Sequence, residues 1–396
     1  MTKAAEEAVT HFSSTDISVS VDGTWQRRGF SSKNGVVTVL TNLGKRQANK
    51  VIDTDIRTTY CHTCPQKNRD NVKLSTIAKD HCCAVNHQES AGKMEADGAV
   101  ACFKRSKAKY GVQYTKYLGD GDSKAFTTVN SMQIYDKPIV KEECTGHVQK
   151  RMGKALMNAV AEHKSEKFIV DANGQQLKKK VANPSRGEKC YSGIGGVNRL
   201  TKKAIMSIQG HYGAAIRENN TLKSIKSAIW AIYHHRSGNH TSCPDWCAAT
   251  NGDLAKANKH RLPAFICNIM KPIFTRLSSA DLLSRCVHGG TQNAKEDFRH
   301  VHWNLCPKEK FCRLTRLSIA TSTATVIFSD GHIGLLGLYR RLGLSVSPNL
   351  IAYVHKTDSA RVTHADISCQ TKTKTKRKKS SHNKAGDDWY AAGAAA

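Results

Sequence analysis

The order of the apolar segments in the first third of the chain limits the available folds most. The segment Asp16–Arg27 alternates apolar and polar residues, the pattern of a half-buried strand, and breaks at Asp22-Gly23. Gly35–Leu40 and Lys50–Tyr60 are two further segments rich in strand-forming residues. A helix is predicted over Ala91–Tyr110, and Val112–Leu118 returns to the strand pattern. Three strands, a helix and a fourth strand predict an α/β domain in which helices cover a sheet.

The rest of the chain is predicted to be mainly helical. A short strand near Pro138–Lys141 precedes a helix over Gly146–His163. Residues 165–285 combine helical segments, loops and scattered cysteines and histidines. A further helix covers Thr291–Leu305, and apolar helical segments continue to Ile351. This order predicts an RNase H-like mixed sheet with flanking helices and a large, mainly helical insertion.

Four regions follow from this order. The first part of the core covers residues 1–164 and contains a small zinc loop at about 61–87, between early strands. The helical insertion covers 165–285, and the second part of the core covers 286–355. A basic tail, which we expect to be disordered, covers 356–396.

The charge of the chain favours a polyanionic partner. Its 61 Lys and Arg residues outnumber its 32 Asp and Glu residues along the whole sequence, which gives a formal net charge of +29. Such a surface attracts nucleic acid. The sequence shows neither an apolar segment after Met1 nor 18 consecutive apolar residues, so we expect no secretion and no membrane partner. In a reducing compartment, closely spaced Cys and His residues favour zinc over disulfides.

One cysteine–histidine cluster has the spacing of a zinc site. Cys61-x-x-Cys64 is followed by His81, Cys82, Cys83 and His87. The thiolate pair can hold one side of a tetrahedral zinc ion, and a second pair can complete it. We predict structural zinc at Cys61, Cys64, His81 and Cys83; the alternative is a set of reduced surface cysteines.

Three carboxylates occupy positions that suit two-metal phosphodiester chemistry. Asp22 ends the first predicted strand, Asp120 follows the fourth, and Glu296 lies on the late helix. Oxygen ligands of this kind suit Mg²⁺ or Mn²⁺, and two such ions about 3.5–4 Å apart serve phosphoryl transfer. Asp122 is an alternative to Asp120, which we prefer because it directly follows the apolar strand.

The residues around these acids resemble the Mutator-like (MULE) DNA transposases, which are DDE enzymes. The similarity runs from about Ser18 to Leu342, and its main blocks are SVDGTWQRRGF, NHQESAGKMEADGAVACFKRS, YTKYLGDGDSKAF, KEECTGHVQKRMGKAL and TQNAKEDFRHVHWNLCPKEKF. The resemblance implies that Asp22, Asp120 and Glu296 are the catalytic acids. It also implies cleavage at transposon ends, strand transfer into target DNA, and a homodimer or higher oligomer that pairs two DNA ends.

One departure qualifies the resemblance. The family usually has Asn before the third acid, where this chain has Lys295, whose ammonium we expect beside Glu296. This departure keeps two alternatives open: an inactive, transposase-derived DNA-binding protein, and an RNase H-type nuclease without strand transfer. By analogy with other DDE recombinases, a second zinc site is expected at Cys144, His147, His235 and His240, with Cys243 and Cys247 as alternative ligands.

The basic tail favours a nuclear protein. Lys372–Lys379 reads KTKTKRKK, a cluster typical of nuclear import signals and of nonspecific DNA contacts. The alternative is a solvated tail without a targeting role.

Overall fold

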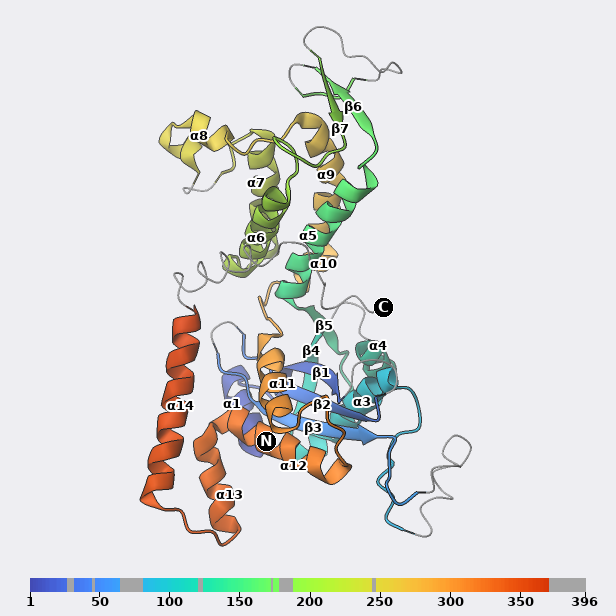
Figure 1. The fold of residues 1–396 in the computed structure, drawn as a ribbon, viewed down its shortest axis with the longest axis vertical. Coiled ribbons are helices and arrows are strands. Elements are labelled where there is room, and N and C mark those ends of the chain that lie inside the picture. Colours follow the sequence, from blue (N-terminus) through green and yellow to red (C-terminus); the bar gives the residue numbers. More distant parts are fainter. Residues whose placement is uncertain are drawn as a thin grey trace. The chain divides into compact units, whose positions relative to one another are not determined.

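A computed structural model describes most of the chain (Figure 1). The described residues are 1–26, 32–44, 47–64, 81–119, 124–171, 174–177, 188–243 and 247–369. They divide into two compact units, one made of residues 1–299 with 307–314, the other of 300–306 with the residues from 315 onward. Among the described helices, none is both long and apolar enough to cross a membrane.

The first unit contains a five-stranded mixed sheet in the order β3-β2-β1-β4-β5. β1 pairs antiparallel with β2 and parallel with β4, while β2 and β3 are antiparallel and β4 and β5 are parallel. The chain is therefore mixed α/β, as the sequence predicts, with β1 at the centre. The strands are β1 (Asp16–Trp25), β2 (Asn34–Thr41), β3 (Val51–Thr58), β4 (Gln113–Gly119) and β5 (Val140–Glu143).

The first strand is longer than we predicted. The sequence indicates a break at Asp22-Gly23, but β1 continues to Trp25, with Asp22 opposite Thr38 and Trp25 opposite Gly35. Gly23 does not form a turn; it is the place where another side chain approaches the backbone of the strand closely. A Cβ atom there would lie 2.8 Å from Cβ and Cγ of Glu95, so only glycine lets that side chain pack over the strand.

The two faces of β1 differ in polarity because side chains alternate along a strand. Val19 and Val21 lie in the apolar core with Ala96, Ala99 and Phe103 of α3 (Ala91–Tyr110). An N-terminal helix that the sequence did not predict, α1 (Thr2–Phe12), adds buried alanines to this core. The opposite face carries polar side chains that are nevertheless buried or half-buried: Ser18, Ser20, Asp22 and Thr24.

Gly98 permits the close contact between α3 and β2, which suggests a stability test. A Cβ on Gly98 would lie 2.5 Å from Val37 Cγ2, whereas a Cβ on Gly92 would meet nothing within 4 Å. We expect Gly98→Ala to lower the free energy of unfolding by up to about 2 kcal/mol, since overpacking costs about 1–3 kcal/mol and Ala gains roughly 1 kcal/mol over Gly in a helix. Urea denaturation should show this loss, and the matched Gly92→Ala should show none. Equal midpoints for the two variants would contradict the close packing.

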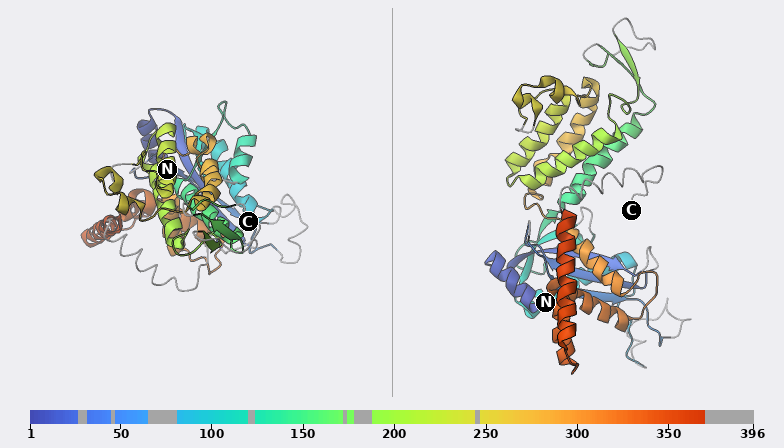
Figure 2. Two further views of the ribbon diagram at one scale, coloured as in Figure 1. Left: turned by 90° about the horizontal axis from the view of Figure 1, so that it is seen from above. Right: turned by 60° about the vertical axis from the view of Figure 1, so that its left-hand side comes forward.

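The segment between β5 and the last part of the first unit is mainly helical and has its own core. Its helices α5, α6, α7 and α9 contribute Met152, Tyr212, Ile229, Phe265 and Phe274 to that core, and they pack side by side in Figure 2. A two-stranded antiparallel sheet, β6–β7, was not predicted. The elements of this segment are α5 (Thr145–Glu162), β6 (Lys167–Val170), β7 (Lys189–Ser192), α6 (Lys202–Glu218), α7 (Leu222–Ser237), η2 (Ala248–Asn251), α8 (Leu254–Asn258), α9 (Ala264–Leu277) and α10 (Ala280–Ser284), whereas α4 (Lys124–Ser131) lies between β4 and β5.

The chain returns to β5 after α10. The Glu143 amide donates to the Arg285 carbonyl at 2.8 Å, and the Thr145 amide donates to the Gly290 carbonyl at 3.1 Å. These bonds fix the start of α5 beside residues 285–290. The next helix, α11 (Asn293–Leu305), carries Glu296 in its first turn.

The second unit is helical. Within it, the Asp358 carboxylate of α14 accepts hydrogen bonds from the backbone amides of His332 and Ile333, at 3.0 and 3.1 Å, and joins η3 to α14. α14 extends to Cys369, beyond the predicted start of the tail at 356. The elements that follow α11 are α12 (Leu314–Asp330), η3 (His332–Gly334), α13 (Leu335–Arg341) and α14 (Pro348–Cys369).

Candidate active site

The polar face of β1 is a hydrogen-bonded layer. Ser18 Oγ donates to Glu142 Oε2 at 3.1 Å, and Asn42 Nδ2 donates to both Ser18 Oγ, at 2.9 Å, and Glu142 Oε2, at 3.1 Å. All three residues are buried. Burying polar groups is costly unless they are paired, and here the pairing is supplied by β1, β5 and the loop after β2. Asp22 lies farther along β1 on the same face, and its side chain is 17% exposed.

Helix α11 contacts β1 at Asp22. Lys295 and Arg299 are four residues apart and therefore lie on the same side of the helix. The buried Lys295 ammonium donates to the Val21 carbonyl, and Arg299 Nη2 donates to the Gly23 carbonyl at 2.8 Å. Arg299 also forms an ion pair with the Asp22 carboxylate. Asp22 thus faces α11, and a guanidinium neutralises it.

Of the other predicted acids, the structure describes Glu296. It is exposed and lies one residue after Lys295, on the helix that contacts Asp22. Lys295 was expected beside Glu296, and its ammonium binds the backbone of β1. Asp120 and Asp122 lie outside the described residues and follow β4, which ends at Gly119. β4 runs parallel to β1, with Leu118 opposite Ser20.

Arg299 is the residue at this site that the sequence reasoning missed. Its four-residue spacing from Lys295 was visible, but its partner depends on how α11 packs against β1. Residues 307–314 close the same polar face farther along the strand, where Gln26 Nε2 donates to the Lys310 carbonyl at 2.6 Å and Asn34 Nδ2 donates to the Cys312 carbonyl at 2.9 Å.

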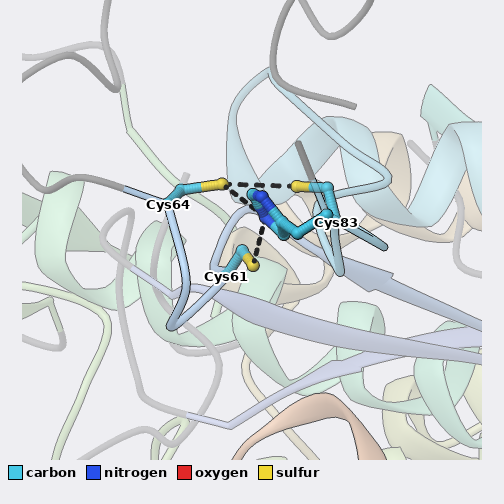
Figure 3. Close-up of side chains that lie close together, drawn as sticks. Cys61, Cys64 and Cys83 are labelled. Carbon is cyan, nitrogen blue, oxygen red and sulfur yellow. Dashed lines mark hydrogen bonds between the residues drawn. The ribbon is translucent and has the colours of Figure 1, made fainter. Parts of the chain in front are cut away.

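The first cysteine–histidine cluster brings together the four predicted residues. His81 Nε2 lies 3.4 Å from both Cys61 Sγ and Cys64 Sγ, and Cys64 Sγ lies 3.4 Å from Cys83 Sγ. Figure 3 shows the three sulfur atoms directed toward one another. The four ligand atoms all lie within 4.8 Å of one another, which is close enough to share a metal ion. The cluster lies near the early strands, as predicted, in the segment between β3 and α3.

The two buried thiols of this cluster differ in their acidity. Burial raises the pKa of Cys61, but hydrogen bonds from the backbone of Ala84, Thr63 and Cys64 outweigh it and lower the pKa to about 5. Burial and the neighbouring thiols of Cys83 and Cys61 raise the pKa of Cys64 to about 12. Cys61 is therefore a thiolate at neutral pH, and Cys64 gives up its proton only when a cation replaces it.

The loop that carries this cluster is attached to the sheet. Asn86 Oδ1 accepts a hydrogen bond from the Thr58 amide at 2.7 Å, and Asn86 Nδ2 donates to the Ile56 carbonyl at 2.8 Å. At the start of α3, the Ala91 carbonyl accepts a hydrogen bond from Trp25 Nε1 at 2.7 Å. The loop is thereby linked to the end of β1, three residues beyond Asp22.

Of the ligands predicted for the second site, the structure groups the two histidines with the alternative cysteines. His235 and His240 meet Cys243 and Cys247, whose ligand atoms lie within 4.8 Å of one another. The reason is local: α7 ends at Ser237, and Gly238, with φ of 87°, turns the chain back onto the end of the helix.

Cys144 and His147 form a separate pair at the start of α5. Burial raises the pKa of Cys144, but hydrogen bonds from His147 and Gln292 outweigh it and lower the pKa below its ordinary value. This pair therefore has a local role and does not belong to the cluster at the end of α7.

The comparisons with known proteins agree with the resemblance in the motifs. A family model described as Mutator-like transposase matches residues 1–247. The matched range contains Asp22, β4 and both cysteine–histidine clusters, and it ends before α11 and Glu296. No curated protein and no solved structure matches the chain. Because the family model covers more than half of the 396 residues, the chain belongs to the Mutator-like transposase family.

Proposed function

We propose that the chain is a DDE-type DNA transposase that cleaves DNA at transposon ends and joins the ends to target DNA. The observation that carries the proposal is the position of Asp22 on the buried polar face of β1, facing the helix that bears Glu296. Asp22, Asp120 and Glu296 are the proposed catalytic acids.

The sheet supports an RNase H-like core for this chemistry. β1 is the central strand, and its parallel neighbour β4 leads directly to Asp120. Asp22 therefore lies on a strand adjacent to the one that Asp120 follows in the sequence, while the antiparallel strands β2 and β3 extend the sheet on the other side. This arrangement favours one shared site over three unrelated carboxylates.

The donor set fits a hard divalent cation. Carboxylate oxygens are the ligands that Mg²⁺ and Mn²⁺ prefer. Asp22 already pairs with a cationic group, the Arg299 guanidinium. When bound, such ions supply Lewis-acid stabilisation of phosphate oxygens and lower the pKa of water. The chain itself contributes Lys295, which fastens α11 to β1, and Arg299, whose half-exposed guanidinium can turn from Asp22 to a DNA phosphate.

DNA is the partner that a transposase requires, and the charge of the chain suits it. A net charge of +29 favours contacts with phosphates, which bring orientation and strong salt dependence. Pairing two transposon ends calls for a homodimer or a higher oligomer.

The experiment is an end-cleavage assay with the full chain. DNA that carries both ends of the element encoding the protein is incubated with Mg²⁺ or Mn²⁺ and a target plasmid. We expect nicks at the junctions between the element and its flanks, followed by joined products. Cleavage without joining would favour the nuclease alternative.

A second candidate function is DNA binding without catalysis. The ion pair between Arg299 and Asp22 favours it, because a guanidinium at the first acid competes with a metal ion. DNA binding without cleavage, in wild type and in a variant that lacks this guanidinium, would support that function over transposition.

We also propose that Cys61, Cys64, His81 and Cys83 hold a structural zinc ion. Thiolate and imidazole ligands in a closed set of four are typical of such sites. The ion would hold together the loop between β3 and α3. Its ligands are separate from the proposed catalytic acids Asp22, Asp120 and Glu296.

The last proposal concerns nuclear import. Lys372–Lys379 lies outside the described residues, and its basic composition suits an import signal. We expect a fluorescent fusion that lacks residues 371–380 to leave the nucleus, while the full chain concentrates there. A deletion that keeps its nuclear concentration would refute the role of this segment.

A further inference from the structure

The end of α7 carries a second set of four soft ligands. His235 lies in the last turn of the helix, and His240, Cys243 and Cys247 follow Gly238. Cys243 Sγ lies 3.4 Å from His235 Nδ1 and 3.5 Å from His240 Nδ1. Cys247 Sγ lies 3.6 Å from His235 Nδ1 and 3.5 Å from His240 Nδ1. Each sulfur therefore faces both imidazoles.

These distances are those of a tetrahedron around a zinc ion. With Zn–S bonds of about 2.3 Å and Zn–N bonds of about 2.0–2.1 Å, a sulfur and a nitrogen ligand are separated by about 3.6 Å. Hydrogen bonding alone does not account for the arrangement. Each Nδ1 carries either one proton or one lone pair, so the two imidazoles can form two linear hydrogen bonds with the sulfurs but not four nearly equal ones. A central cation satisfies all four atoms at once.

A hydrogen bond outside the cluster orients one ligand. His240 Nε2 lies 3.1 Å from Asn258 Oδ1, at the end of α8. An Nε2–H that donates to this amide oxygen leaves Nδ1 with its lone pair toward the sulfurs. Ligating histidines in proteins almost always donate their second ring nitrogen in this way.

The segment that follows α7 needs such a ligand because its own core is small. Among the described residues of 238–262, the buried apolar side chains are Cys247, Ala257 and Leu262. We call this segment, which contains η2 and α8, the 238–262 lobe. A lobe with so little apolar burial is stabilised in other small folds by disulfides or metals.

We infer that His235, His240, Cys243 and Cys247 bind one structural Zn²⁺ that fastens the 238–262 lobe to the end of α7. Two thiolates and two imidazoles in a closed tetrahedral set select zinc over the hard divalent cations. The site is independent of the carboxylates and of transposition.

Zinc content of the purified full chain tests the site. We expect Cys247→Ser and His240→Ala each to lower the zinc content by one atom per chain relative to wild type. Cys190→Ser, which changes an exposed cysteine outside both clusters, should leave it unchanged. Full zinc content in both ligand variants would overturn the inference.

Two further measurements keep the test valid if a ligand variant folds poorly. In the wild-type chain, a Co²⁺ titration should fill two tetrahedral sites with thiolate ligands per chain, and saturation of their absorption bands at one equivalent would overturn the inference. Asn258→Ala retains all four ligands, and chelator competition should show affinity about 10–100-fold weaker. Unchanged affinity would contradict the assignment of His240 Nδ1 as a ligand.

Discussion

Replacing Asp22 with Asn is expected to lower metal-dependent DNA cleavage by about 10²–10⁴-fold. The amide keeps the shape of the side chain but removes the charge that holds a divalent cation. Such ions contribute several kcal/mol of transition-state stabilisation, and each 1.36 kcal/mol is tenfold in rate. Asp120→Asn and Glu296→Gln should have effects of the same size. Folding should persist, and DNA affinity should rise slightly because a negative charge facing the phosphates is lost.

Matched variants separate the proposed acids from their neighbours. Asp297→Asn changes the exposed carboxylate next to Glu296 on α11 and should leave cleavage unchanged. Asp122→Asn changes the carboxylate nearest in sequence to Asp120 and should also leave cleavage unchanged. If Asp122→Asn abolishes cleavage and Asp120→Asn does not, the second acid is Asp122. If none of the three acid substitutions lowers cleavage, the catalytic proposal is wrong.

Arg299 distinguishes an active enzyme from an inactive descendant. Arg299→Gln removes the guanidinium from Asp22 and should raise the affinity of the site for Mn²⁺ in a binding titration. Lys295→Asn, which restores the residue usual in the family, has two opposing effects. It removes an ammonium near the acids but also breaks the hydrogen bond to the Val21 carbonyl, so stability should fall.

The second large effect is expected at the cluster after β3. Cys61→Ser should remove one zinc ion per chain and lower the free energy of unfolding by more than about 4 kcal/mol, the range typical of a lost metal or disulfide. The ligands come from both ends of the loop between β3 and α3, so loss of the ion removes the link between these two ends. Metal analysis and thermal denaturation of the purified chain measure the two effects.

The same loop supplies the control for this prediction. Cys82 is exposed and lies between two proposed ligands, so Cys82→Ser should keep both the zinc and the stability. Acidification should release the ion as protons compete for the ligands, and toward pH 5 the thiolate of Cys61 itself becomes protonated. Full zinc content in Cys61→Ser would show that this residue is not a ligand.

Local patterns in the sequence predicted those features that depend on residues close together in the chain. The alternation in Asp16–Arg27 predicted β1, and the spacing of Cys61, Cys64, His81 and Cys83 predicted a cluster that the structure assembles. The predicted end of β1 at Asp22 was wrong because Gly23 was interpreted as a turn residue. Its actual role depends on Glu95, which is 72 residues away in the sequence and packs over the strand.

The errors at the sites have a similar cause. The analogy preferred Cys144 and His147 as partners of His235 and His240, whereas the turn at Gly238 brings the alternative ligands Cys243 and Cys247 to those histidines. Arg299 was missed because its ion pair with Asp22 depends on the packing of α11 against β1. Contacts between elements far apart in the sequence leave no local pattern.

We propose that the polar face of β1 beneath α11 is a divalent-metal site. Anomalous diffraction from crystals of the full chain soaked in Mn²⁺ tests it most directly. The account predicts manganese density at the Asp22 carboxylate, with the Arg299 guanidinium displaced from it. An Arg299–Asp22 ion pair that persists at saturating Mn²⁺, without manganese density at Asp22, would contradict the account.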